Sequence, residues 1–340
     1  MNPLAPLIVD LCAEAAALTA RLGRRVEVAA LGVLDREGEL PLAAPGGLVS
    51  PNGACRLFRA ADGWMALNLA RVEDRDLVPA WLGCDLDDDP WALVTIHAGG
   101  RRSADLVAGA TLLGLPAAAV GEVSAETPRA PTLRLGRGGR RAGALQVVDL
   151  SALWAGPMCG AILAAMGASV LKVESVRRPD PTALSTPAFA HRLNGTKQAL
   201  ALDFAAADGR ARLAEVVAGA DVLITGARPR ALAALGLEPA PLFAANPGLV
   251  WVAITGYGWT GEAGDRVAFG DDAAAAGGLV RWTADGPRFL GDALADPVTG
   301  LAAALGAMRG LEQGGGVFVD AALARVAAGA ATAIGLQAAA

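Results

Sequence analysis

The sequence predicts an α/β protein with an open, mostly parallel, Rossmann-like sheet and a smaller α+β domain. Strand-like and helix-like segments alternate through the second half of the chain, as they do in doubly wound sheets. Residues 145–175 read as one β-α-β crossover, with a buried strand, a glycine-bearing loop, a small-residue helix and a second buried strand. Because ligands bind beyond the carboxyl ends of such strands, we expect a ligand at the loop 150–157.

Residues 1–123 are predicted to form the smaller domain. A helix is expected at 6–22, where apolar residues recur on one face. A hairpin follows at 54–69 around an Ala-Asp-Gly turn. Helical segments at 77–82 and 102–113 complete the unit.

Residues 124–144 are predicted to be an exposed linker, because Pro, Gly and Arg dominate and apolar periodicity is absent. Its arginines are Arg129, Arg134, Arg137, Arg140 and Arg141. Two interpretations stay open for them: a solvated connector, or a segment from which one or two arginines reach a phosphate.

Residues 145–340 are predicted to form the larger domain. Beyond the crossover, the predicted strands are 199–203, 221–225, 249–254 and 316–323, and the predicted helices are 207–219, 231–235, 239–245, 273–279 and 296–310. The apolar segment 321–340 carries Arg325 and Gln337, which favours a helix packed on the sheet over a membrane span.

Composition narrows the function classes. Hydrophobic residues make up 54% of the 340 residues and charged ones 19%, so a large core can be buried. The net charge of −5 gives no general attraction to nucleic acid or to an anionic membrane. The four cysteines are scattered without a CxxC pair, which indicates reduced, buried thiols in a cytoplasmic protein. Two histidines are too few for a histidine-rich metal site, and no signal peptide is visible.

Three local motifs are candidate sites. Residues 256–261 match GxGxxG after a strand, but a polar loop follows in place of a helix, so a glycine-rich loop near a ligand is favoured over dinucleotide binding. Asp296 stands before Pro297 at a predicted helix start, where it either caps the helix or acts as an ionised nucleophile. Arg228 and Arg230 follow a strand and fit either a phosphate site or a solvated loop.

Five ordered blocks between about residues 145 and 325 resemble the family III CoA-transferases. The first has a strand ending in Asp149, then Ala-Gly-Pro at 155–157 and Lys-Val-Glu at 172–174. The others are LNGTKQALALDF, DVLITGARPRALAALGL, NPGLVWVAITGYGWTG and GGGVFVDAAL. The resemblance implies the family fold, transfer of CoA between an acyl-CoA and a carboxylic acid, and an interlocked homodimer. Acyl-CoA and coenzyme A would be substrates, with no permanently bound cofactor.

The resemblance also implies residue roles. In LGDALADPVTG, Asp296 falls at the place of the family's nucleophile, and Asp292 is four residues too early. The carboxylate would form a covalent aspartyl intermediate. The family's CoA-binding positions, with the arginines that could replace lost contacts, are Ala152, Leu153, Trp154, Ala155, Leu202, Gly226, Ala227, Arg228 and Arg230. Gly277 and Gly278 are the candidate oxyanion loop.

Departures from the family pattern leave alternatives open. Segments 51–83 and 106–125 resemble parts that follow the nucleotide-fold half in typical members. The chain therefore looks circularly permuted, or like the tail of one unit joined to the head of the next. We expect these segments to complete the active site in cis or across a dimer. Phe269 and Gly270 replace the His-Asp pair of related racemases, which disfavours racemase chemistry. The alternatives are another acyl-CoA enzyme of this fold, such as an isomerase or epimerase, and a non-catalytic acyl-CoA-binding subunit.

Overall fold

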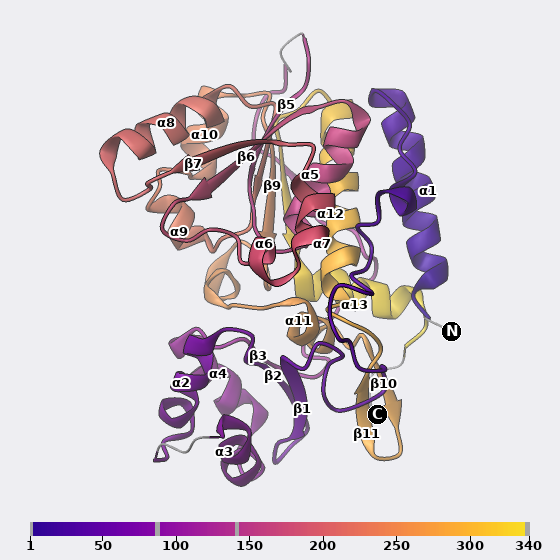
Figure 1. Ribbon diagram of the computed structural model, residues 1–340, viewed down its shortest axis with the longest axis vertical. Coiled ribbons are helices and arrows are strands. Elements are labelled where there is room, and N and C mark those ends of the chain that lie inside the picture. Colours follow the sequence, from indigo (N-terminus) through magenta and orange to yellow (C-terminus); the bar gives the residue numbers. More distant parts are fainter. Residues whose placement is uncertain (1–2, 86–88, 140–142, 337–340) are drawn as a thin grey trace.

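A seven-stranded, mostly parallel sheet forms the centre of the protein, as predicted (Figure 1). The computed structural model describes residues 3–85, 89–139 and 143–336. In spatial order the strands are β4 (Thr132–Arg134), β12 (Val317–Ala322), β9 (Val250–Thr255), β8 (Val222–Thr225), β5 (Gln146–Leu150), β6 (Ser169–Ser175) and β7 (Gln198–Leu202). All pairings are parallel except that of the edge strand β4 with β12. The chain continues from β5 to one side and returns through β8 on the other, so the carboxyl end of β5 is a topological switch point.

Helices cover both faces of this sheet (Figure 1). One face carries α1 (Ala5–Leu22), α5 (Ala155–Met166), α7 (Pro187–Asn194), α12 (Ala295–Glu312) and α13 (Leu323–Ala333), and the other carries α8 (Ala207–Ala218), α9 (Pro229–Ala233) and α10 (Pro239–Ala245). Alternate strand residues divide between the two cores: Val147 packs with the first set, and Val148 packs with the second. This burial of both faces explains the nearly continuous apolar strands of the sequence.

A small unit lies beyond one end of the sheet domain (Figure 1). Its sheet joins β1 (Cys55–Arg59), β2 (Trp64–Asn68) and β3 (Ala117–Ala119), and its helices are α2 (Val72–Leu82), α3 (Pro90–His97) and α4 (Ser103–Leu113). The helix α11 (Gly270–Ala276) packs against β2 and β3, so the small unit meets the large domain within one chain. The hairpin of β10 (Val280–Thr283) and β11 (Gly286–Phe289) adjoins this contact.

The first helix belongs to the large domain, which differs from the predicted boundary at residue 123. Leu11, Ala15 and Leu18 of α1 share one core with residues of α5 and α12. The 3₁₀ helix η1 (Val28–Leu31) joins the same core. The reason is that periodicity defines the apolar face of a helix but not the partner that covers it. The predicted linker is likewise not only a connector, because it contributes β4; Arg140 and Arg141 lie outside the described residues.

Most predicted elements are confirmed, with shifts at their ends. Helix α10 has the predicted bounds, whereas α11 begins three residues before its predicted start at residue 273. The segment after β12 forms α13, a helix packed on the sheet core. Over the described part of the chain, none of the helices combines the length and apolar character that a membrane crossing requires. All four cysteines are free, and Cys12 and Cys84 are only half-buried, contrary to the expectation of full burial.

Candidate active site

A buried ion pair anchors the loop at the switch point. Lys197 Nζ lies 2.8 Å from Asp149 Oδ2, and both side chains are fully buried. The same ammonium donates to the Pro157 carbonyl and to Asn194 Oδ1, each at 2.8 Å. Burial opposes ionisation of Asp149, but Lys197, Lys172 and the hydrogen bonds outweigh it and lower its pKa to about 2. The Asp and Lys of the family motifs therefore hold the loop and are not free to meet a ligand.

The loop itself is tightly shaped. The Lys172 ammonium bonds the Ser151 carbonyl, and Asp180 Oδ2 accepts the Leu153 N–H at 3.0 Å. Leu153 has a φ of 69°, a left-handed conformation that non-glycine residues rarely adopt. A Cβ on Gly156 would collide with the Ser151 side chain, which explains the glycine of Ala-Gly-Pro. These contacts expose Ala152 and Leu153 beyond the sheet.

The predicted CoA-binding residues do not share one environment. Gly226 lies against Ser151, with an added Cβ 3.3 Å from its Cα, so the loops after β5 and β8 meet as expected. Trp154 is buried and donates its indole N–H to the Val33 carbonyl at 2.9 Å. Leu202 is only 9% exposed and lies in the core of the other sheet face. The side chains of Trp154 and Leu202 are therefore corrected to packing roles.

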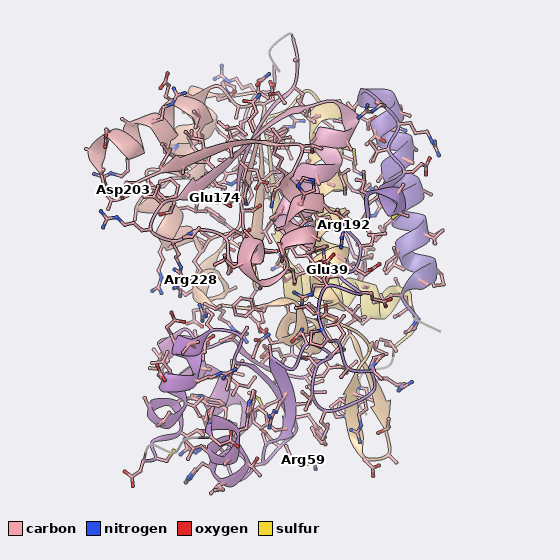
Figure 2. The ribbon with its side chains drawn as sticks, in the orientation of Figure 1. Glu39, Arg59, Glu174, Arg192, Asp203 and Arg228 are labelled. Atoms are coloured by element: carbon pink, nitrogen blue, oxygen red, sulfur yellow. The ribbon has the colours of Figure 1, made fainter. Side chains whose placement is uncertain are left out.

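Arginines converge on a cavity of about 270 Å³ between the small unit and the strand-end loops. Arg228 and Arg230 line it with Arg178 and with Arg71 of α2, and Figure 2 shows Arg228 where the large domain faces the small unit. Burial and the neighbouring charges of Arg230, Arg71 and Arg178 lower the pKa of Arg228. Glu73 and Asp74 also line this cavity, and Asp74 pairs with Arg71 at 2.6 Å. The positive charge that fits a phosphate group therefore comes mainly from Arg178, Arg228 and Arg230.

Asp296 is not a helix cap, which corrects one of the two predicted roles. The helix α12 begins at Ala295, so Asp296 is already inside its first turn, and Leu294 makes no side-chain capping bond. Burial raises the pKa of the Asp296 carboxyl to about 7; the guanidinium of Arg36 and the N–H of Ala155 oppose that rise. Desolvation therefore outweighs the position in the first helical turn, which by itself favours the ionised carboxylate.

Two further carboxylates surround Asp296. Asp271 and Asp292 both raise its pKa, and Arg36 lies among the three groups. Asn52 donates to Asp271 Oδ2 at 2.7 Å and to Asp292 Oδ1 at 2.6 Å. Burial, reinforced by the charge of Asp292, raises the pKa of Asp271 to about 6 although Asn52 opposes it.

Gly270 lies close against the Asp296 carboxylate, whereas the predicted Gly277 and Gly278 have another role. A Cβ on Gly270 would collide with Asp296 Oδ2, so this position leaves room for the acid alone. The N–H groups of Gly277 and Gly278 donate to the carbonyls of Ala273 and Ala275 at the carboxyl end of α11. Both amides are thus engaged within the chain, and the assignment of Gly277 and Gly278 as an oxyanion loop is corrected.

Comparison with known proteins identifies the family. The sequence profile of CoA-transferase family III matches residues 144–339, more than half of the chain. The chain belongs to CoA-transferase family III. It is 33% identical over 193 residues to succinyl-CoA–D-citramalate CoA-transferase of Chloroflexus aurantiacus, covering 52% of this chain and 47% of that protein. It is also 33% identical to succinate–glutarate CoA-transferase of Agrobacterium fabrum, covering 53% and 50%.

Solved structures agree with the family assignment. A CaiB/BaiF family protein from Brucella suis is 31% identical with a TM-score of 0.51, and the match covers 58% of this chain and 56% of that one. A hypothetical protein from Mycobacterium tuberculosis is 27% identical with the same TM-score, covering 58% of each chain. The chain spans about half the length of the curated relatives it matches.

Within this family III member, the region outside the matched residues supplies site residues that sequence reasoning missed. Arg36, Asn52 and Arg71 lie near Asp296 or Arg228, but more than 150 positions away along the chain. No local pattern could have found them.

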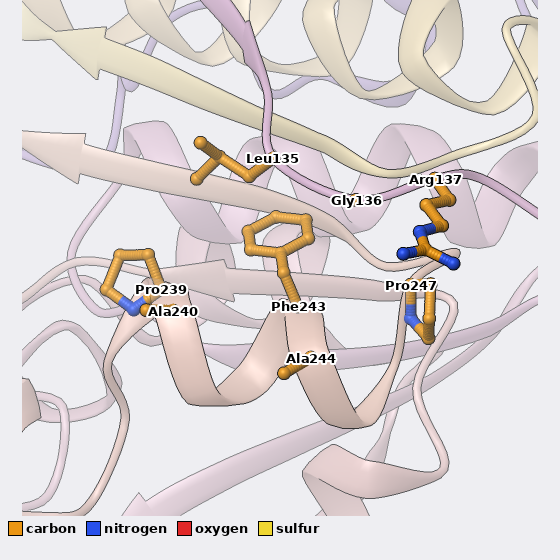
Figure 3. A pocket seen from close by; sticks show the side chains of 8 residues that line it. All are labelled: Leu135, Gly136, Arg137, Pro239, Ala240, Phe243, Ala244 and Pro247. Carbon is orange, nitrogen blue, oxygen red and sulfur yellow. The ribbon is translucent and has the colours of Figure 1, made fainter.

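A larger cavity, of about 690 Å³, lies elsewhere in the family III domain (Figure 3). It opens between the segment after β4 and helix α10, and its lining includes Leu135, Arg137 and Phe243. None of the residues assigned to the site lines this cavity. Size alone therefore does not identify the site.

Proposed function

We propose that this protein is a CoA-transferase that moves CoA between an acyl-CoA and a carboxylic acid, with Asp296 as the nucleophile. The observation that carries the proposal is a carboxyl group whose surroundings raise its pKa to about 7, placed beside the amino end of α5 at the switch point of the sheet. Family membership and the CoA-transferase names of the relatives support it.

The chemistry requires a carboxylate that reacts with a thioester. Asp296 attacks the thioester carbonyl, the C–S bond breaks, and CoA leaves as a thiolate, so that the acyl group remains on Asp296 as a mixed anhydride. The thiolate then attacks the aspartyl carbonyl and releases the donor acid, leaving an enzyme–CoA thioester. The acceptor carboxylate attacks that thioester, expels the CoA thiolate and forms a second mixed anhydride with Asp296. The thiolate then attacks the acceptor carbonyl of this anhydride, which gives the new acyl-CoA and frees the Asp296 carboxylate. A partly desolvated carboxylate is a stronger nucleophile than a fully hydrated one, which suits the observed burial.

The arginine-lined cavity is proposed to hold phosphate groups of coenzyme A. Arg228 and Arg230 belong to the loop after β8, and Arg71 comes from the small unit. The exposed residues Ala152 and Leu153 belong to the loop that lies against Gly226 and leads into α5, whose first residue, Ala155, donates its N–H to Asp296. Ala155, Gly226 and Ala227 are proposed to contribute backbone contacts along the same path.

The acids of the reaction are proposed to be small dicarboxylates. The names of the relatives pair succinyl-CoA or succinate with citramalate or glutarate. Succinyl-CoA is therefore the first donor to test. A homodimer, a cytoplasmic location and a circularly permuted order remain proposals, the last resting on the resemblance of residues 51–83 and 106–125 to later parts of typical family members.

A hydroxylamine trap tests the proposed function. Wild-type protein incubated with succinyl-CoA should form an aspartyl hydroxamate at Asp296, detected by peptide mass spectrometry, and should transfer CoA to an added acid. Asp296→Asn should do neither, because a neutral amide does not attack a thioester. Asp285→Asn, in the exposed turn of the β10–β11 hairpin, is the control. Normal transfer by Asp296→Asn would refute the nucleophile assignment.

The second candidate is a non-catalytic acyl-CoA-binding subunit. The observation that favours it is the burial of Trp154 and Leu202, which removes two of the predicted CoA-binding side chains from the site. One relative from Chloroflexus aurantiacus is named as a beta subunit of succinyl-CoA–L-malate CoA-transferase. Binding of CoA without hydroxamate formation or transfer would select this alternative.

A further inference from the structure

The segment between α1 and β1 contacts the turn that immediately precedes α12, the helix in which Asp296 lies. Arg36 forms a two-point contact with Asp292, with Nε 2.6 Å from Oδ2 and Nη2 3.0 Å from Oδ1. Asn52 donates from one amide nitrogen to Asp292 and to Asp271. Both residues lie outside residues 144–339, which the family profile matches.

These contacts continue to the backbone of Asp296. Asp271 Oδ1 accepts the N–H of Ala293 at 2.7 Å, and the carbonyl of Ala293 accepts the N–H of Asp296 at 2.9 Å. Ala293 has a φ of 45°, in the left-handed region. A non-glycine residue keeps such a conformation only where its surroundings hold it there. The bond from Asp271 is one such restraint.

The segment that carries Arg36 is itself anchored. Arg192 of α7 donates to the Gly32 carbonyl and to Glu39 Oε1, each at 2.7 Å, and Figure 2 shows Arg192 beside Glu39. The Arg36 guanidinium also lies 5.2 Å from the ring centre of Trp154. A guanidinium fixed by a carboxylate fork and an aromatic ring has little freedom left.

We propose that Arg36 and Asn52 are positioning residues for Asp296, acting through Asp292 and Asp271. Together they hold the turn before α12 and balance the charges next to the nucleophile. This inference rests on the proposed function, because it assigns a role relative to Asp296. It adds to the family III site two side chains from a segment that the family profile does not cover.

The charges around Asp296 predict opposite shifts of its pKa in two variants. The charged side chains that act on Asp296 are Arg36, Asp271 and Asp292, and the Ala155 N–H also favours its ionised form. Arg36→Gln removes the cation and leaves Asp292 unpaired, so both changes disfavour an ionised Asp296. Asp292→Asn removes an anion and frees Arg36, so both changes favour it. A role confined to folding predicts no such opposition.

The test measures kcat/KM against pH with succinyl-CoA. Arg36→Gln should move the acid limb to higher pH and Asp292→Asn to lower pH, each by on the order of one pH unit, and the double variant should lie near wild type. Arg36→Lys should keep the limb but lower kcat, because the two-point contact is lost. Asn52→Ala should lower kcat on the order of 10- to 100-fold with KM nearly unchanged. Arg25→Gln, in an exposed pair with Glu27, is the control.

A carboxyl ¹³C titration of Asp296 gives the same readout without turnover. Absence of transfer by the wild type would therefore overturn the proposed function alone, while the titration still judges the positioning. If Arg36→Gln does not fold, the shift of the acid limb in Asp292→Asn relative to wild type decides, and it should be to lower pH. Shifts of opposite sign support the proposal. Unchanged or same-direction shifts, or an Asn52→Ala variant with wild-type kcat, overturn it.

Discussion

Gly270→Ala is predicted to disable the site while leaving the fold intact. The added Cβ would lie 2.6 Å from the Ala293 carbonyl oxygen and 2.7 Å from the Ala293 Cβ, and closer still to Asp296 Oδ2. Ordinary contact begins at 3.4 Å, so even the Ala293 oxygen must move by about 0.8 Å. The carboxylate must move further, because it is the nearest neighbour.

The magnitude follows from that displacement. A misplacement of about 1 Å in a reacting group costs on the order of 100-fold in rate. Overpacking of this kind lowers the free energy of unfolding by about 1–3 kcal/mol, which is less than the total of about 5–15 kcal/mol that is usual for a folded protein. We therefore expect kcat/KM for CoA transfer to fall by about two orders of magnitude in a protein that still melts cooperatively.

The assay compares kcat/KM with succinyl-CoA and the thermal melting of wild type and variant. Gly63→Ala is the matched control, because an added Cβ there has no neighbour within 4 Å and the backbone is not left-handed. A Gly270→Ala variant with kcat/KM within threefold of wild type would refute the close fit around Asp296.

Three more outcomes are expected. Burial raises the pKa of Asp296 to about 7, whereas the same carboxyl in an unfolded chain has a pKa of about 4. Between these values the folded state binds more protons than the unfolded state, so the free energy of unfolding falls as the pH rises. Asp296→Asn removes this loss and should therefore raise the melting temperature more at pH 8 than at pH 5. Lys197→Met leaves the buried Asp149 carboxylate without its partner and should lower the free energy of unfolding by about 3–5 kcal/mol in urea titrations. Arg228→Ala and Arg230→Ala should each raise the KM for acyl-CoA on the order of 10-fold, with normal melting, if they bind phosphate.

Each outcome has its control and its contrary result. An equal change in melting at both pH values would contradict the assigned pKa of Asp296. Adding Asp149→Asn to Lys197→Met should restore part of the lost stability, and no restoration would contradict the ion-pair argument. Arg212→Ala, in an exposed pair with Glu215 on α8, should leave KM unchanged. Unchanged KM in the double variant of Arg228 and Arg230 would assign that loop to solvent.

The sequence by itself determined the sheet, the strand-end loop at 150–157 and the place of the proposed nucleophile, Asp296. Neighbouring strand residues such as Val147 and Val148 are both apolar because both faces of the sheet are covered, and that pattern is local. The motif around Asp296 is likewise contiguous, so it could be aligned without knowing what packs around it.

Only the tertiary structure decided the environment of Asp296. The pKa of Asp296 depends on desolvation and on Arg36 and Asp271, which reach it from other parts of the chain. The apolar periodicity of α1 did not show which core covers that helix. The glycine pair Gly277 and Gly278 did not show that its amides already donate within the chain. Sequence patterns record local geometry, whereas burial and charge at a site depend on which distant segments meet there.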